Sequence, residues 1–429
     1  MQQRIRPASS LSGSITLPGD KSISHRYAMI ASLAEGATRI SNYSTGADCR
    51  STLACMGALG IEIEGDGPEL VVTGCGLDGL RAPARDLDAS NSGSTIRMLS
   101  GILSAQPFAS RIGGDESLSR RPMQRIMRPL TMMGAHIRAR EDKFPPLDIQ
   151  GSTLHPIEYT LPVASAQVKT CVLFAGLFAE GSTSVIEPVR SRDHTEIALR
   201  EFGADLTIER QKITVHGRPA LTAREVTVPS DLSSAAFFLV AALLLRGSRL
   251  AIHGVGLNPT RSALLDFLSG MGAKIHIPDL ESRNGELVGD LVVEHSAVQG
   301  GVIEGALTAA LIDEIPVLAV LGAASEEGLT VRDANELRVK ETDRIRTIVE
   351  NLRRMGVSAE EFPDGFVVPG RQKFRPARFD SCGDHRIAMA FAIAALAGDG
   401  ESVMDGAEAA SVSFPEFWDT LSACSQFDN

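Results

Sequence analysis

Aromatic side chains are scarce in this chain. Among its 429 residues there are one Trp and three Tyr, and Phe, Trp and Tyr together make up 5%. Proteins that bind single-stranded nucleic acid stack the bases on such rings. Basic residues are outnumbered by acidic ones, and the formal net charge is −11. The composition therefore argues against nucleic-acid or anionic-membrane partners, and a site for an acidic ligand has to be a local basic cluster.

The chain also lacks paired cysteines, metal-ligand spacings, a secretory signal and a long apolar run. Its six cysteines include no CxxC pair, which favours reduced cytosolic thiols over disulfides or a zinc site. His194 and His385 have no partners at ligand spacing, so no metal is expected. Residues 1–10 have no apolar core typical of a signal peptide. The longest apolar run, Ala235–Leu245, has eleven residues and is too short to cross a bilayer. We therefore predict a cytoplasmic protein.

The densest polar segment is Asp20–Arg26, with the sequence DKSISHR. It follows a Pro-Gly pair at which a strand over residues 13–17 is expected to end. Asp20 or Ser22 can serve as N-cap for a helix that starts here. Free N–H groups at a helix N-terminus, two hydroxyls, a lysine and an arginine together suit an anion. The segment therefore predicts a contact to phosphate or carboxylate.

Helix starts of this kind recur along the chain. A polar cap followed by an apolar helix is found six times, with steps of 70, 74, 66, 82 and 71 residues, at Lys21, Asn91, Ser165, Asp231, Asp313 and Asp384. Between them, amphipathic helices end five times at a glycine suited to a left-handed C-cap, followed by a strand, at Gly60, Gly134, Gly203, Gly272 and Gly356. These patterns predict six α/β repeats of about 70 residues each.

Six repeats in 429 residues, 43% of them hydrophobic, suggest two domains of three repeats. The last repeat runs out of chain near Asn429, and we expect the N-terminal strand to complete it. The first domain is therefore placed at residues 19–228 and the second at residues 1–18 plus 229–429. Helices as apolar as Ala235–Leu245 should be buried, and parallel bundling would bring the capped N-termini together in a cleft between the domains. The alternative is a repeat scaffold with ordinary caps, but ordinary caps need no cations against the helix dipole.

Three further segments add charged groups. Gly114–Pro122 places Arg120 and Arg121 on a loop before a helix. Leu337–Arg344 alternates charges densely. On a helix, its Lys340 and Arg344 would share a face, with Glu341 pointing between them and Arg338, although a solvated helix face is an alternative.

The third segment is the acidic pair Asp313-Glu314 before a buried helix. One carboxylate would cap the helix and the other would face the cleft, where neighbouring lysines and arginines would favour its ionised form as a general base. Arginine pairs with carboxylate or phosphate bidentately, and lysine acts as a point charge. The segments together predict substrates rich in phosphate and carboxylate, with two or three carboxylates left for proton transfer.

These motifs closely resemble the 5-enolpyruvylshikimate-3-phosphate synthase (3-phosphoshikimate 1-carboxyvinyltransferase) family over essentially the whole chain. In order they are Gly19–Arg26, Asn91–Thr95, Arg121-Pro122, Leu337–Arg344 and Asp384–Arg386, while Ala164–Lys169 and Ser191–Glu196 look like the class II branch. The resemblance implies a two-domain inside-out α/β barrel, three repeats per domain, that closes on substrate as a monomer without a cofactor. It also implies transfer of the enolpyruvyl group of phosphoenolpyruvate to the 5-hydroxyl of shikimate 3-phosphate with release of phosphate. This is a step of the shikimate pathway to chorismate and the aromatic amino acids, and the target of glyphosate.

The resemblance also implies roles for individual residues. Shikimate 3-phosphate would be held by Lys21, Ser22, Arg26, Ser165, Ala166, Gln167, Arg192, Asp313 and Lys340. Phosphoenolpyruvate would be surrounded by Lys21, Gly93, Arg121, Gln167, Arg344 and Arg386. As catalytic residues, Asp313 would take the proton of the 5-hydroxyl and Glu341 would protonate the methylene carbon. Lys21 would assist proton transfer and stabilise the leaving phosphate.

The chain departs from the family pattern in two places. Many relatives carry a lysine shortly before the terminal Phe-Pro, where this chain has Ser411–Ser413. The asparagine often found four residues before Lys340 is Glu336 here. Gly93 keeps the small residue that some glyphosate-tolerant members replace with alanine, so tolerance does not follow from class alone.

The sequence leaves two alternative functions open. The related enolpyruvyl transferase that acts on UDP-N-acetylglucosamine would be expected to carry a cysteine in the loop at residues 113–117, and this chain has none there. A non-catalytic anion-binding scaffold is the other alternative. The presence of Asp313, Glu341 and Lys21 argues against it, because binding alone needs no acid/base pair.

Overall fold

The computed structural model describes residues 1–65 and 67–427. Contacts between Cα atoms divide the chain into two compact units. The first unit comprises Gly19–Val228 and Arg283–Glu286, and the second comprises Met1–Pro18, Pro229–Ser282 and Leu287–Asn429. The predicted second domain included residues 283–286, which in the structure belong to the first unit. The reason is that Thr227 N donates to Asn284 Oδ1 at 3.0 Å and His194 Nδ1 lies 2.7 Å from Glu286 Oε1.

The first unit repeats one series of elements three times. The first series is α1 (Lys21–Leu33), β3 (Glu35–Ser41), α2 (Ala47–Ala58), β4 (Glu62–Glu64), β5 (Leu70–Cys75) and β6 (Leu87–Asp88). The second is α3 (Gly93–Leu103), β7 (Ala109–Gly113), the 3-10 helix η1 (Leu118–Arg120), α4 (Gln124–Met132), β8 (His136–Arg140), β9 (Phe144–Gln150) and β10 (Glu158–Thr160). The third is α5 (Ala166–Gly176), β11 (Ser182–Ile186), α6 (His194–Glu201), β12 (Leu206–Glu209), β13 (Lys212–His216) and β14 (Glu225–Thr227).

The second unit begins with β1 (Gln2–Ile5) and β2 (Ser10–Thr16) and resumes after the first unit. Its fourth series is α7 (Leu232–Leu244), β15 (Arg249–Gly256), α8 (Ala263–Gly270), β16 (Lys274–His276), β17 (Leu280–Arg283), β18 (Glu286–Glu294), β19 (Gly300–Ile303) and α9 (Ala306–Leu311). The fifth series is α10 (Ile315–Ala324), β20 (Gly328–Val331), η2 (Asn335–Val339), α11 (Arg344–Arg354), β21 (Glu360–Phe362), β22 (Gly365–Pro369) and β23 (Arg378–Asp380). The last is α12 (His385–Leu396), β24 (Ser402–Asp405), η3 (Ala407–Val412), α13 (Phe417–Cys424) and β25 (Ser425–Gln426).

Each series contributes to a sheet with the same pairing pattern. The sheets run β14-β3-β5-β4, β6-β7-β9-β8, β10-β11-β13-β12, β16-β18-β15-β2-β25, β19-β20-β22-β21 and β1-β24-β23, and β17 also pairs with β18. In each sheet one pair is parallel, such as β14 with β3, and the next pair is antiparallel, such as β3 with β5. In the last sheet the antiparallel partner of β24 is β1. The N-terminal strand thus pairs with the last long strand of the chain's final series.

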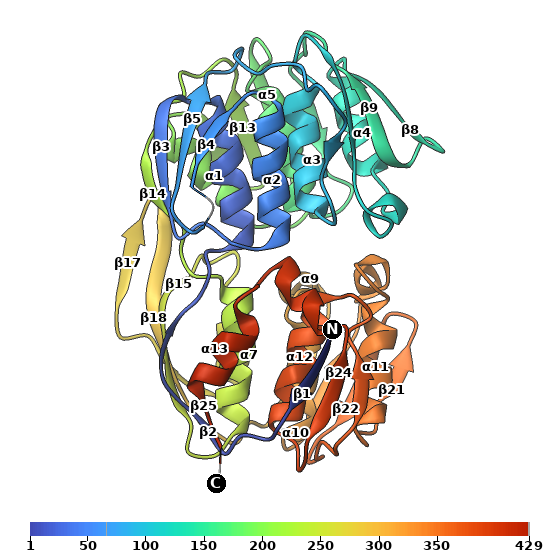
Figure 1. Cartoon of the computed structure of the whole chain (residues 1–429). Coiled ribbons are helices and arrows are strands. Elements are labelled where there is room, and N and C mark those ends of the chain that lie inside the picture. The colour runs from blue at the N-terminus through green and yellow to red at the C-terminus, as the bar shows by residue number, and fades with distance from the viewer. Residues whose placement is uncertain (66, 428–429) are drawn as a thin grey trace. The chain divides into compact units, whose positions relative to one another are not determined.

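The cores lie around the apolar helices, which bundle side by side within each unit (Figure 1). In the first unit, α3 packs against both α1 and α5, and in the second, α7, α10 and α12 contact one another. All but one of the residues of α7 are buried, because Leu232–Leu244 is apolar on every side. Strands of the same unit lie around these bundles (Figure 1). The polar N-terminal ends of the buried helices are therefore where charged groups can gather.

The amphipathic helices end as predicted. Gly60, Gly134, Gly203, Gly272 and Gly356 all have positive φ, between 76° and 104°. Each lies two residues beyond the end of α2, α4, α6, α8 or α11. A glycine accepts this left-handed conformation without a Cβ penalty and so terminates the helix. Among the described residues, no helix combines the length and the hydropathy that spanning a bilayer requires.

Candidate active site

The helix starts of the first unit are built by local side-chain caps. Asp20 accepts a hydrogen bond from Ile23 N at 3.0 Å, and Ser92 accepts one from Thr95 N at 3.1 Å. Ser165 accepts a longer one from Val168 N at 3.4 Å. The caps satisfy only part of the free N–H groups at each helix end. Lys21, Gly93 and Ala166 are thus the first residues of α1, α3 and α5, where an anion is favoured.

Lys21 and Arg26 both extend from α1, and each is held by partners. Lys21 Nζ lies 2.9 Å from Asp48 Oδ2, at the start of α2. Arg26 donates from Nε to Thr195 Oγ1 at 2.6 Å and from Nη2 to Thr170 Oγ1 at 2.9 Å. Its Nη1 donates to the carbonyl oxygen of Ser22 at 2.7 Å. The guanidinium is therefore fixed in one orientation.

The pKa of Arg26 is lowered to about 10, mainly by burial and in smaller part by the nearby charge of Arg192. Glu196 and Asp20 oppose this effect. At neutral pH Arg26 remains protonated. Two cations, Arg26 and Arg192, therefore occupy the region between α1 and the start of α6, as an anionic ligand would require.

The starts of α3 and α5 are joined by Gln167. Its Oε1 accepts a hydrogen bond from Arg97 Nη1 at 2.7 Å, and its Nε2 donates to Ser94 Oγ at 2.9 Å. Arg121 donates from Nη2 to Asn91 Oδ1 at 2.8 Å. A Cβ atom added at Gly93 would lie 3.0 Å from Arg97 Nη1 and 3.5 Å from Arg121 Nη1. Gly93 thus leaves room for two guanidinium groups.

Three charged side chains are almost completely buried beneath this cluster. Lys169 Nζ lies 3.0 Å from Glu187 Oε2 and 2.8 Å from Glu196 Oε1, and all three side chains are at most 2% exposed. Glu187 Oε1 also accepts hydrogen bonds from the main-chain N and the hydroxyl of Ser191. The group therefore joins α5, the loop that carries Arg192, and α6. Sequence reasoning missed it, because residues 169, 187 and 196 show no common local pattern.

His25 forms a second buried polar group, with hydroxyls from α2 and α3. Its Nδ1 lies 2.7 Å from Thr52 Oγ1, which lies 2.7 Å from Thr95 Oγ1. The pKa of His25 is well below 6.5, first because of burial and then because of the charges of Lys21 and Arg26. The folded protein therefore keeps this imidazole neutral near pH 7.

Lowering the pH below about 6.5 is expected to destabilise the protein through His25. The unfolded chain protonates this histidine near pH 6.5, whereas the folded chain resists protonation until a lower pH. The free energy of unfolding should therefore fall with falling pH by up to about 1.4 kcal/mol per pH unit. Urea unfolding between pH 7.5 and pH 5 measures this slope. His25→Asn should reduce the slope, whereas the control His216→Asn, at an exposed site, should keep it; equal slopes in His25→Asn and the wild type would contradict the prediction.

In the second unit, Asp313 is surrounded by three cations. Its Oδ1 lies 3.6 Å from Arg344 Nη1 and 3.7 Å from Arg386 Nε. Lys340 Nζ lies 3.9 Å away. Arg386 also donates to the carbonyl oxygen of Asp313 at 2.9 Å. The side chain of Asp313 is 16% exposed, so its carboxylate remains accessible to a ligand.

Arg344 is the centre of this second cluster. Its Nη2 donates to Glu341 Oε2 at 2.6 Å, and its Nε donates to Asp384 Oδ2 at 2.7 Å. The side chain is 1% exposed. The charges of Asp384 and Glu341 raise its pKa in spite of burial. One buried guanidinium thus holds the carboxylates of Glu341 and Asp384 and lies beside that of Asp313.

Two local predictions for this unit were wrong. Residues 337–344 do not form one helix with Lys340 and Arg344 on one face. The 3-10 helix η2 ends at Val339, and α11 starts at Arg344, because Asp343 Oδ1 accepts from Arg346 N and caps a new helix. Neither Asp313 nor Glu314 caps α10 with its side chain. Glu314 Oε1 instead accepts a hydrogen bond from the hydroxyl of Ser233.

The predicted site residues therefore fall into two clusters. The cluster of the first unit contains Lys21, Ser22, Arg26, Gly93, Arg121, Ser165, Ala166, Gln167 and Arg192, and the cluster of the second unit contains Asp313, Lys340, Glu341, Arg344 and Arg386. The structure adds partners that sequence reasoning gave no role: Asp48, Arg97, Thr170 and Thr195. Asn91 and Asp384 are at predicted helix starts, and this position in the sequence could have indicated that they contact the site residues. Of the two adjacent arginines, Arg120 is exposed and forms an ion pair with Glu116, whereas Arg121 contacts Asn91.

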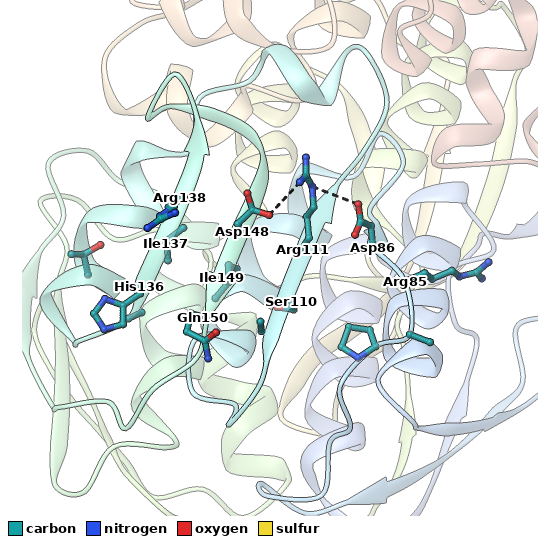
Figure 2. Close-up of a pocket in the computed structure, with 15 residues that line it drawn as sticks. Arg85, Asp86, Ser110, Arg111, His136, Ile137, Arg138, Asp148, Ile149 and Gln150 are labelled. Atoms are coloured by element: carbon teal, nitrogen blue, oxygen red, sulfur yellow. Dashed lines mark ion pairs between the residues drawn. The ribbon is translucent and has the colours of Figure 1, made fainter.

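The first unit also has a concavity of about 860 Å³ away from these residues. It lies on the sheet of β7, β8 and β9, and its charged side chains include Arg111, Asp86 and Asp148 (Figure 2). Arg111 lies 3.5 Å from a carboxylate oxygen of each aspartate. No predicted site residue lines this concavity. We therefore treat the two clusters of helix starts, one in each unit, as the candidate functional groups.

A comparison with known protein families identifies the family of the chain. The family model of EPSP synthase (3-phosphoshikimate 1-carboxyvinyltransferase) matches residues 5–421. The chain belongs to the EPSP synthase family. The predicted family is thereby confirmed over nearly the full length of the chain.

Individual relatives of the EPSP synthase family are similar over their whole length. The 3-phosphoshikimate 1-carboxyvinyltransferase of Solibacter usitatus is 77% identical over 421 residues, which cover 98% of this chain and 99% of that protein. The enzyme of the same name from Koribacter versatilis is 53% identical, with 97% and 98% covered. A solved structure of EPSP synthase from Acinetobacter baumannii is 40% identical with a TM-score of 0.89, covering 99% of this chain and 98% of that one. The enolpyruvyl transferase NikO from Streptomyces tendae, 19% identical with a TM-score of 0.79 over 98% and 96% of the chains, shares the fold. The mixed α/β fold of EPSP synthases is therefore the fold of this chain.

Proposed function

We propose that the two clusters together transfer the enolpyruvyl group of phosphoenolpyruvate to the 5-hydroxyl of shikimate 3-phosphate, with release of phosphate. The observation that carries the proposal is the pair of carboxylates on Arg344, with Asp313 at 3.6 Å and Glu341 at 2.6 Å. The reaction needs one group that removes a proton and one that donates a proton. A shared guanidinium places both near one bound substrate.

The two units would serve as the functional domains, each an inside-out α/β barrel of three repeats. Buried helices with capped N-terminal ends in both units support this arrangement. We propose that both clusters face the same substrates in a cleft between the domains. Closure on the substrates would exclude water and protect the reactive intermediate.

The cluster of the first unit supplies the anion-binding groups. In our proposal Arg26, Ser22, Ser165, Ala166, Gln167 and Arg192, with Lys340 and Asp313 from the other cluster, hold shikimate 3-phosphate. Gly93, Arg121 and Gln167 hold phosphoenolpyruvate, together with Arg344 and Arg386. Lys21 contacts both substrates. The fixed orientation of Arg26 and the room at Gly93 support these assignments.

The chemical steps follow from these positions. Asp313 accepts the proton of the 5-hydroxyl as the oxygen attacks C2 of phosphoenolpyruvate, and Glu341 donates a proton to the methylene carbon. The resulting tetrahedral intermediate loses phosphate as a proton leaves the new methyl group. Lys21 stabilises the developing charge on that phosphate. Glu341 takes a proton back from the methyl group, and the proton that Asp313 took from the 5-hydroxyl leaves with the phosphate, so both carboxyl groups return to their starting states.

A phosphate-release assay tests the function. Purified protein with phosphoenolpyruvate and shikimate 3-phosphate should release phosphate, and UDP-N-acetylglucosamine as control acceptor should give none. The absence of cysteine from residues 113–117 supports this preference. Release with the sugar nucleotide alone would overturn the proposal in favour of the related transferase. Binding of both substrates without any release would favour a non-catalytic scaffold.

Arg26→Lys is expected to raise the KM for shikimate 3-phosphate by about 10- to 100-fold with a smaller effect on the KM for phosphoenolpyruvate. A lysine cannot donate to Thr195 and Thr170 while also holding its charge in a fixed position. A hydrogen bond to a charged group contributes about 1.5–3 kcal/mol, which corresponds to the expected change in KM. Steady-state kinetics with each substrate varied in turn measure the two constants. Arg50→Lys, at an exposed site on α2, is the matched control. An unchanged KM for shikimate 3-phosphate would remove Arg26 from the site.

A further inference from the structure

The segment at residues 340–343 carries two of the proposed site residues but belongs to neither neighbouring helix. It connects η2, which ends at Val339, to α11, which starts at Arg344. Lys340 and Glu341 lie within it. A short connection without hydrogen bonds of a helix or strand has to be held by other contacts if its side chains are to keep one position.

Arg338, two residues before the segment, supplies such contacts. Its Nη1 donates to Asp343 Oδ2 at 2.7 Å, which joins the two ends of the segment directly. The same Nη1 donates to Glu361 Oε1 at 3.0 Å. Its Nη2 and Nε donate to the carbonyl oxygens of Phe362 and Pro363, each at 2.6 Å. One guanidinium thus closes the segment and fastens it to the hairpin of β21 and β22.

The geometry points to Arg338 as a positioning residue for Glu341 and Lys340, acting through the ion pair with Asp343 and the bonds to the β21–β22 hairpin. This inference rests on the proposed function, in which Glu341 donates a proton. Arg338 itself needs no contact with either substrate. Four hydrogen bonds in different directions require the planar fork of an arginine, and a lysine cannot make them all at once.

Asp343 divides its two oxygens between separate tasks. Oδ1 accepts from Arg346 N at 3.1 Å and caps α11, and Oδ2 accepts from Arg338. An asparagine could keep the cap through its carbonyl oxygen but would present an amide N–H₂ group to the guanidinium. Asp343→Asn therefore separates the capping role from the positioning role.

Steady-state kinetics test the inference. A misplacement of about 1 Å can cost about 100-fold in rate, so we expect Arg338→Ala to lower kcat by about that factor. Arg338→Lys and Asp343→Asn should lie between Arg338→Ala and the wild type. Arg346→Ala, which removes an exposed ion pair with Glu350 on α11, is the matched control and should leave kcat within about twofold.

Combination with Glu341→Gln separates positioning from a merely structural role. If Arg338 acts through Glu341, Arg338→Ala should lower kcat much less in the Glu341→Gln background than in the wild type. Equal losses in both backgrounds, or a kcat of Arg338→Ala near that of the wild type, would overturn the inference.

Hydrogen–deuterium exchange tests the same contact without relying on the reaction. Amides of residues 339–343 should exchange faster in Arg338→Ala than in the wild type or in the control Arg346→Ala. The melting temperature of Arg346→Ala should equal that of the wild type. Unchanged exchange in that segment would also overturn the inference. Because this measurement uses no substrate, it distinguishes failure of the inference from failure of the proposed function, which the phosphate-release assay of the wild type decides.

Discussion

Glu341→Gln and Asp313→Asn are each expected to lower kcat by about 10²- to 10⁴-fold, the usual contribution of a general acid or base. Glutamine can still accept the hydrogen bond that Arg344 donates at 2.6 Å, so the local structure should persist. It carries no carboxylic proton to donate. Asparagine at position 313 keeps the side-chain shape beside Arg344 and Arg386 but cannot take up the proton of the 5-hydroxyl.

Turnover and binding have to be measured separately in these variants. Phosphate release gives kcat, and calorimetric titration with shikimate 3-phosphate gives Kd, which should change far less than kcat. Glu350→Gln is the matched control, because Glu350 lies on α11, where it forms an exposed pair with Arg346. Near-normal turnover in Glu341→Gln or in Asp313→Asn would show that the acid or base role assigned to that residue is wrong.

Lys169→Met is expected to lower the free energy of unfolding by about 3–5 kcal/mol, the cost of breaking a buried ion pair by removing one partner. Lys169 is the cation between Glu187 and Glu196, and none of the three side chains is more than 2% exposed. Burial already raises the pKa of Glu196, although Lys169 opposes the shift. Without Lys169 both carboxylates would face each other in a nonpolar environment.

The pH dependence of this loss has a defined sign. The folded variant can relieve the repulsion by binding protons, so the folded state should hold more protons than the unfolded state above pH 4.5. The free energy of unfolding that Lys169→Met loses relative to the wild type should therefore be smaller at pH 5 than at pH 8.

Urea unfolding of the wild type and of Lys169→Met at pH 5 and pH 8 measures this loss of unfolding free energy. Lys212→Met, which breaks an exposed pair with Glu158, is the control and should unfold at nearly the same urea concentration as the wild type. Replacing Glu196 with glutamine in Lys169→Met should restore part of the stability. A loss in Lys169→Met no larger than that of the control would contradict the expectation.

Local signals in the sequence predicted most of the repeat structure. Asp20, Ser92, Ser165, Asp231 and Asp384 all accept hydrogen bonds from the first turn of a helix. A cap acts within three residues, so its effect can be read without knowledge of the fold. The glycines after the amphipathic helices are local in the same way, because positive φ is a property of the single residue.

The prediction was wrong where two local signals competed. Residues 337–344 include several good helix formers, but Asp343 caps a new helix within that run. The prediction that Asp313 or Glu314 caps α10 was also wrong, because Glu314 bonds to Ser233, which precedes it by 81 residues. A contact over such a distance has no local pattern from which it could be predicted.

The sequence by itself determined most of the helix starts, the glycine-terminated helix ends and the family, because caps, turn glycines and motifs act over a few residues. Only the tertiary structure decided which charges meet. It placed Lys169 between two glutamates, Arg344 beside Asp313 and Glu341, and residues 283–286 with the first unit. The physical reason is that Coulomb forces and hydrogen bonds depend on distances in space, which are set by how the buried helices pack.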